Sequence, residues 1–171
     1  MRLEQVNGKN IWELVKLRVK EGQASFVATN TESILEAYVS ITSGGTALPF
    51  GIYDGDVPVG FLMIGYDTDR SWKNPPPIAT GNYNLWRLMI DQRFQGRGYG
   101  RQAVKLALEY IRTFPCGAGA LCWLSYEPEN QAAKKLYESC GFRATGELDM
   151  GELIMAQALQ GGDGGALYPN L

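Results

Sequence analysis

Histidine is absent from all 171 residues of the sequence. Its absence excludes imidazole-based catalytic triads, zinc–histidine sites and imidazole acid–base chemistry. Any proton transfer must therefore use Tyr, Asp, Glu, Lys, Cys or water. The three cysteines, Cys116, Cys122 and Cys140, are odd in number and have neither metal-ligand nor redox spacing. We therefore expect reduced thiols, no metal site and a cytoplasmic protein.

Long apolar runs and a strong excess of one charge are missing as well. The most apolar stretch, residues 57–66, is far too short to cross a bilayer, and the first ten residues lack the apolar core of a secretory signal. We therefore expect no membrane association. The net charge of −2 gives no reason to expect nucleic acid as a partner. A chain of this length fits a single domain that buries its own core.

The apolar periodicity and the turn residues predict a mixed α/β sheet in the order β-α-α-β-β-β-α-β-α-β-β. Strands are expected at 2–6, 47–53, 57–66, 82–90, 120–126, 143–148 and 153–159. Helices are expected at 11–19 after an Asn10 cap, at 31–43 with a Thr31 cap and an apolar face of Ile34, Leu35, Tyr38 and Val39, at 98–113 and at 130–140. Residues 1–159 form one domain in this prediction. The Gly-rich end, 160–171, is expected to be mobile, or else to be ordered by a neighbouring subunit, which would allow a homodimer.

Residues 95–100, QGRGYG, place small residues and a cation where a strand gives way to a helix. Exposed backbone amides and the positive end of the helix dipole favour a bound phosphate at such a turn. The turn lacks the GK[ST] ending of a P-loop and the GxGxxG spacing, which argues against a nucleoside triphosphate or a dinucleotide. Arg93, Arg97 and Arg101 could bracket a pyrophosphate, or they could form a solvated basic edge.

Two motifs carry a family resemblance. Gln95, Gly98 and Gly100 resemble the Q/R-x-x-G-x-G/A signature of the GNAT acetyltransferase superfamily. Residues 130–142, NQAAKKLYESCGF, resemble the N-x-x-A-x-x-L-Y-x-x-x-G-F segment of the same superfamily, and they follow in the same order. The resemblance covers residues 2–159. It implies the GNAT fold and an acyltransferase that moves an acetyl group from acetyl-CoA to a primary amine, by direct attack in a ternary complex.

The resemblance also implies how the cosubstrate acetyl-CoA is held, with no metal. Main-chain groups of the strand before the turn pair with the pantetheine arm, as a peptide adds to a sheet edge. A backbone N–H of this bulged strand, near Met89, polarises the thioester carbonyl. The turn residues hold the pyrophosphate, and Asn130 hydrogen-bonds the pantetheine. The implied residues are Leu88, Met89, Ile90, Gln95, Gly96, Arg97, Gly98, Tyr99, Gly100, Arg101, Asn130 and Lys134.

The resemblance places the general acid at Tyr137, which would protonate the leaving thiolate; the alternative is a core aromatic. The general base is harder to place. An alkylammonium acceptor has a pKa of about 10.4, so deprotonation at pH 7 costs on the order of 4.6 kcal/mol. Residues 84–87, where some relatives carry a Glu, contain no carboxylate. Glu127 is the best candidate, followed by Glu129, although both could belong to a solvated loop. Removal of the proton through water is the default interpretation.

The acceptor is suggested by a narrower resemblance. Residues 26–38 and 83–91 are similar to small bacterial spermine/spermidine acetyltransferases. A polyamine needs carboxylates and aromatic faces along its length, and Glu32, Glu36 and Trp86 could supply them. Glu32 and Glu36 could equally be an ordinary solvated helix face. The alternatives for the chain are an acetyltransferase for aminoglycosides or protein amino groups, and a non-catalytic acetyl-CoA-binding sensor.

Overall fold

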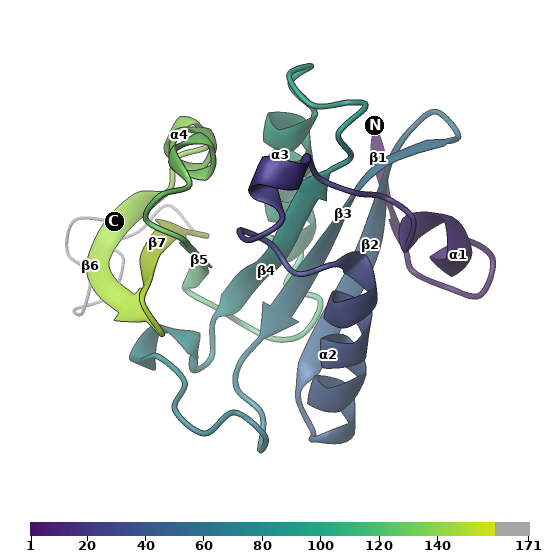
Figure 1. The fold of residues 1–171 in the computed structure, drawn as a ribbon. Coiled ribbons are helices and arrows are strands. Elements are labelled where there is room, and N and C mark those ends of the chain that lie inside the picture. Colours follow the sequence, from purple (N-terminus) through teal and green to yellow (C-terminus); the bar gives the residue numbers. More distant parts are fainter. Residues whose placement is uncertain (160–171) are drawn as a thin grey trace.

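A computed structural model of the chain describes residues 1–159, whose core is one seven-stranded sheet with the strand order β1-β2-β3-β4-β5-β7-β6 (Figure 1). Its strands are β1 (Arg2–Gln5), β2 (Thr46–Asp54), β3 (Val57–Tyr66), β4 (Tyr83–Ile90), β5 (Leu121–Tyr126), β6 (Arg143–Asp149) and β7 (Glu152–Ala158). The helices are α1 (Ile11–Leu14), α2 (Asn30–Thr42), α3 (Tyr99–Ile111) and α4 (Gln131–Ser139). This order confirms the mixed α/β prediction. The expectations for 160–171 lie outside the described residues.

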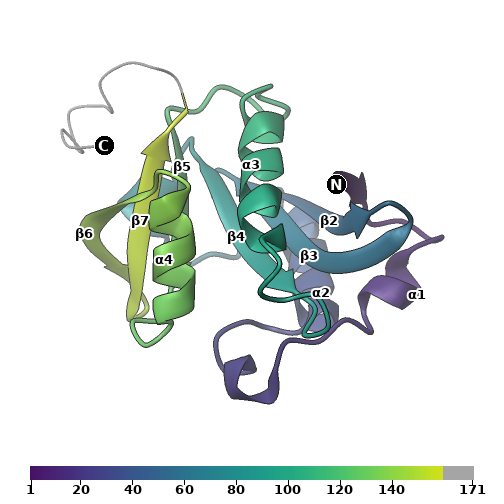
Figure 2. The ribbon, with the colours of Figure 1, turned by 90° about the horizontal axis from the view of Figure 1, so that it is seen from above.

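The helices cover opposite faces of the sheet. Helices α3 and α4 lie side by side on one face, and α2 lies on the other (Figure 2). Each face has its own core, with Val104, Leu124 and Tyr137 in the larger cluster under α3 and α4. Ala37, Phe61 and Met63 belong to a smaller cluster under α2. A residue's core cluster therefore tells which face of the sheet its side chain occupies.

The first helix is shorter than predicted. It ends at Leu14 instead of continuing to residue 19, because groups far along the chain capture its backbone. The Asn30 side chain donates a hydrogen bond to the Leu14 carbonyl at 2.8 Å. The Arg18 N–H donates to Asp91 at 3.0 Å, and the Arg18 carbonyl accepts from the Gln92 N–H at 2.8 Å. The backbone leaves the helix to make these long-range bonds, which a local pattern cannot reveal.

Asp91 holds this segment against the end of β4. Its buried carboxylate accepts hydrogen bonds from the Arg18 N–H and, at 3.0 and 2.7 Å, from the N–H and Nε of Arg93. Burial by itself raises the pKa of Asp91, but the hydrogen bonds from Arg93 and Arg18 outweigh it and hold this pKa below its usual value. Asp91 therefore fixes the connection that continues, through residues 19–28, along the candidate site.

The prediction for α2 was wrong about its cap and about three of the four residues of its buried face. The cap is Thr29, whose side chain and that of Glu32 form a reciprocal capping box. The predicted apolar positions Leu35, Tyr38 and Val39 are 61%, 67% and 51% exposed. The buried positions are instead Asn30, Ser33, Ala37 and Ser40, and the predicted Ile34 also packs on the core. Small side chains on this face leave room for the large side chains of the strands, which fill most of the core between the helix and the sheet.

Strands β4 and β5 separate soon after they meet. They pair in parallel only at Tyr83 with Cys122 and at Asn84 with Trp123. β4 also carries a bulge: Ile64 pairs with Leu85 and Met63 with Arg87, which leaves Trp86 as the extra residue. β4 is therefore a bulged strand, as expected, and its bulge precedes Met89, near which the polarising N–H is predicted. The divergence of the two strands opens the sheet at the candidate site.

Candidate active site

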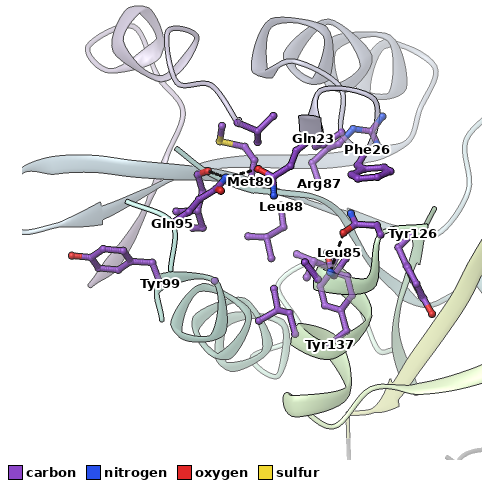
Figure 3. Close-up of a pocket in the computed structure, with 18 of the residues that line it drawn as sticks. Gln23, Phe26, Leu85, Arg87, Leu88, Met89, Gln95, Tyr99, Tyr126 and Tyr137 are labelled. Carbon is purple, nitrogen blue, oxygen red and sulfur yellow. Dashed lines mark hydrogen bonds between the residues drawn. The ribbon is translucent and has the colours of Figure 1, made fainter. Parts of the chain in front are cut away.

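A cavity of about 430 Å³ lies where β4 and β5 diverge. The lining residues Tyr99, at the start of α3, and Tyr137, on α4, lie across β4 from Gln23 and Phe26, and the Tyr99 ring points outward (Figure 3). Tyr137 belongs to the core under α3 and α4, whereas the lining residue Trp86 packs on the core under α2. The cavity is therefore lined from both faces of the sheet, so two reactants could enter it from opposite sides.

The glycine turn forms one end of the cavity. Gly96 and Gly98 have φ values of +79° and +82°, which suit glycine, and Gly98 is the N-cap of α3 without any side-chain cap. Within residues 1–159, no acceptor takes a hydrogen bond from the N–H groups of residues 95–100. The Gln95 side chain fixes the turn by donating to the Ile90 carbonyl at 2.9 Å. This array of unpaired N–H groups at a helix N-terminus has the chemistry that a pyrophosphate requires.

Most of the residues implied for acetyl-CoA line this cavity, and three do not. Arg97, Arg101 and Lys134 lie outside its lining. The Arg97 guanidinium lies over the Phe94 ring, 5.7 Å from its centre, and Arg101 Nε donates to a serine hydroxyl on α4. The roles of all these residues stay predictions. The members that line the cavity are Leu88, Met89, Ile90, Gln95, Gly96, Gly98, Tyr99, Gly100 and Asn130.

The edge of β4 and the start of α4 provide polar groups for a chain-like ligand. Beyond Asn84, the main chain of β4 has no pairing with β5 in the described part of the protein, so an extended ligand could pair there. The Asn130 Oδ1 accepts a hydrogen bond from the Ala133 N–H at 3.0 Å and caps α4. Its Nδ2 group is then the part of the side chain available to a ligand.

Tyr137 is both a core aromatic and a cavity residue. It packs with its ring centre 6.0 Å from that of Phe142 and 6.4 Å from that of Tyr126. Burial, with smaller contributions from Cys140 and Glu152, raises the pKa of Tyr137 far above its usual value. No residue within 1–159 hydrogen-bonds its hydroxyl. A phenol that stays protonated and has no protein partner can donate a proton to a group in the cavity.

The carboxylate in the cavity is one that sequence reasoning missed. Glu127 and Glu129 do not line the cavity, and of the described residues that do, only Glu152 is acidic. The Ser125 hydroxyl donates a hydrogen bond to the Glu152 carboxylate. Antiparallel pairing of β5 with β7 brings the two together, since Tyr126 pairs with Leu153. No short motif joins residues so far apart in sequence, so only the topology reveals this pair.

The three residues predicted to bind the acceptor lie in different surroundings. Trp86 lines the cavity. Glu32 does not; Thr29 donates to it from its N–H at 2.8 Å and its hydroxyl at 2.7 Å, and these hydrogen bonds lower the pKa of Glu32. Glu36 forms a salt bridge at 2.7 Å with Arg87, a cavity residue that the prediction overlooked. Glu36 therefore borders the cavity through its partner, and Glu32 serves the helix cap.

Residues 1–159 contain no group of three His, Cys, Asp or Glu side chains that could hold a metal ion. None of their helices combines the length and apolar character needed to cross a bilayer.

Comparison with known proteins gives consistent matches. The family model described as "Acetyltransferase (GNAT) family" matches residues 12–142. A spermine/spermidine N(1)-acetyltransferase of Bacillus subtilis (strain 168) is 30% identical over 166 residues, which cover 93% of this chain and 99% of the relative. Among solved structures, an aminoglycoside acetyltransferase in complex with coenzyme A matches with a TM-score of 0.73 and 16% identity, covering 92% of this chain and 94% of the other. The spermidine N-acetyltransferase from Vibrio cholerae in complex with CoA and spermine matches with a TM-score of 0.63 and 17% identity, with the same two coverages.

Proposed function

The chain belongs to the acetyltransferase (GNAT) family and is an acetyl-CoA-dependent N-acetyltransferase, and we propose that its acceptor is a polyamine such as spermidine or spermine. The acetyl group passes directly from acetyl-CoA to a primary amine of the acceptor while both are bound. A curated relative that aligns over most of the chain is named for this class of acceptor, which supports the proposal.

The donor half of the reaction falls to groups on and around β4. Acetyl-CoA supplies an acetyl group activated as a thioester. The unpaired N–H groups of residues 95–100 would bind its pyrophosphate, and the unpaired edge of β4 would hold the pantetheine arm. A backbone N–H at the Trp86 bulge is suited to polarise the thioester carbonyl, because the bulge turns main-chain groups out of the ladder. Tyr137 would give its proton to the departing sulfur.

One observation carries the choice of a cationic acceptor, namely the charge around the cavity on the α2 face. Glu152 lines the cavity there, and Glu36 borders it. Arg87 is the one cation among the described lining residues, and Glu36 already neutralises it at 2.7 Å. The excess of one negative charge favours an ammonium group over a neutral or anionic acceptor. The ring of Trp86 adds an aromatic face in the same region.

A thiol-release assay with several amines tests this proposal. Purified protein is mixed with acetyl-CoA and, separately, with spermidine, spermine, kanamycin and a peptide with a free N-terminus; a sample without amine corrects for hydrolysis. We expect the highest kcat/KM with spermidine or spermine, and mass spectrometry should find the acetylated polyamine. Higher kcat/KM with kanamycin or the peptide would replace the polyamine with that acceptor class. Tight acetyl-CoA binding without turnover of any amine would instead indicate a sensor.

A further inference from the structure

We propose that Glu152, held by the hydroxyl of Ser125, is a catalytic residue that removes the proton from the acceptor's ammonium group. The inference rests on the proposed amine acceptor but not on which amine it is. It assigns the general base to a residue on β7, away from both family motifs and from the carboxylates that the sequence suggested.

The reaction needs such a group because the acceptor arrives protonated. With a pKa of about 10.4, roughly one alkylamine molecule in 2,500 is uncharged at pH 7, and only the uncharged form can attack a thioester. A base in the cavity raises the reactive fraction where it is needed. Histidine, the usual group for this task, is absent from the chain.

The position of Glu152 fits the task better than that of any other acidic residue described. It is the one carboxylate that lines the cavity within residues 1–159. Ser125 lies next to it and shares the cavity lining, so the hydrogen bond between them fixes the carboxylate at the cavity wall. Glu36 is held by Arg87, and Glu32 caps α2. Neither of these two carboxylates is presented to the cavity as Glu152 is.

Glu152 also lies on the face of the sheet opposite Tyr137, as expected for a base that acts across the cavity from the acid. Side chains alternate along a strand, and Ile154, two residues after Glu152, packs in a core on the face opposite α3 and α4. Leu153, between them, packs on the core under α3 and α4 together with Tyr137. Glu152 and Tyr137 therefore reach the cavity from opposite faces. This arrangement places a base and an acid on the two sides of a reacting group.

The charged and titratable groups around Glu152 come from each neighbouring element. Asp149 pairs with it across the β6–β7 hairpin, and burial together with Glu152 raises the pKa of Asp149. Tyr126 on β5 and Tyr137 on α4 both have raised pKa values, chiefly from burial. Arg87 on β4 is the cation that shares the cavity lining. The cavity lining thus combines Glu152 with these two phenols and one cation, and Asp149 lies beside Glu152 in the hairpin.

The proton transfers balance as follows. Glu152 takes one proton from the ammonium group and returns it to solvent. The uncharged nitrogen attacks the thioester carbonyl carbon, so that a C–N bond forms and the C–S bond breaks. The sulfur receives a proton from Tyr137, and the second proton lost by the nitrogen restores the phenol. The net products are the amide, the free thiol and one proton in solution.

The variant Glu152→Gln tests the inference, with Glu109→Gln on the exposed side of α3 as the matched control. We expect kcat/KM for spermidine to fall about 100- to 1,000-fold in Glu152→Gln at neutral pH and to stay at the wild-type value in Glu109→Gln. The affinity for acetyl-CoA and the Tm of both variants should match the wild type. The deficit of Glu152→Gln should shrink as the pH rises, because more of the acceptor is then already uncharged.

A second acceptor separates base catalysis from a structural role. A fluorinated alkylamine whose pKa lies below the assay pH needs no base, so wild type and Glu152→Gln should acetylate it at similar rates. An equal loss of kcat/KM with both amines would overturn the inference, and so would an unchanged kcat/KM with spermidine. A fall in Tm or in acetyl-CoA affinity large enough to account for the loss would also overturn it. If the wild type prefers another amine class, the polyamine proposal fails, and the same comparison on that amine still tests Glu152.

Discussion

Replacing Tyr137 with Phe removes a single hydroxyl from the cavity and should separate the chemical step from binding and folding. The ring is buried between Tyr126 and Phe142, and phenylalanine preserves those packing contacts. The hydroxyl makes no hydrogen bond within residues 1–159. Its removal therefore leaves no group of the described residues unpaired, and the free energy of unfolding should change by less than about 1 kcal/mol.

The expected loss of turnover is much larger. General acid catalysis contributes a factor of about 10² to 10⁴, so kcat should fall by that factor, which equals roughly 2.7 to 5.4 kcal/mol of activation free energy. Acetyl-CoA affinity should stay within about twofold, because the hydroxyl is expected to act on the sulfur only as the C–S bond breaks.

The pKa of Tyr137 also predicts how kcat depends on pH. Burial, followed by Cys140 and Glu152, raises the pKa of Tyr137 above the usual value of about 10. A raised pKa keeps the phenol protonated up to higher pH, so wild-type kcat should not fall between pH 7 and about 10 through loss of this proton. Steady-state thiol release with acetyl-CoA and spermidine gives kcat for the wild type and for Tyr137→Phe. The Tm and the acetyl-CoA affinity of the two proteins serve as controls. Unchanged kcat in Tyr137→Phe would refute the assignment of the general acid.

Three further predictions concern the turn, the acceptor side and the anchor of the 19–28 connection. Gly98→Ala places a Cβ on a residue at φ +82°, so it should lower the free energy of unfolding by about 1 kcal/mol and weaken acetyl-CoA binding. Calorimetry measures both effects, and the control is Gly8→Ala, at a residue with an ordinary φ and open space around it. Arg87→Gln removes the cavity's cation and releases Glu36, so the KM for spermidine should fall, whereas Glu36→Gln should raise it; the opposite signs would contradict the charge argument. Asp91→Asn should cost about 1–3 kcal/mol of unfolding free energy at pH 7, by denaturant titration. Because the pKa of Asp91 is lowered on folding, its stabilisation is present at neutral pH and is lost as the pH falls below about 4, so the two proteins should converge there.

The parts of the fold that the sequence predicts best depend on local signals. The Asp-Gly turn between two apolar runs predicts the β2–β3 hairpin, and Gly55 in its turn has a φ of +57°. The apolar positions Val104, Ala107, Leu108 and Ile111 predict the buried face of α3, and all four are buried. Each signal lies within one element and its turn, so no distant contact is needed to read it.

The parts that could not be predicted depend on distant contacts. Helix α1 ends early because Asp91, which lies far from it in the sequence, accepts a hydrogen bond from the backbone that would have continued the helix. The buried residues of α2 are small and mostly polar, and they are buried because they lie over side chains of β2 and β3. Glu152 reaches the cavity only because β7 pairs with β5. In each case the deciding partner lies in another element.

The most direct test of the central claim is a product analysis of the complete reaction. Wild-type protein, acetyl-CoA and spermidine are incubated together, and free thiol and acetylated spermidine are quantified in the same samples, against samples without amine. We predict that acetylated spermidine accumulates and that one thiol is released for each acetyl group transferred. Thiol release that does not depend on spermidine, or none at all from a protein that binds acetyl-CoA, would contradict the account.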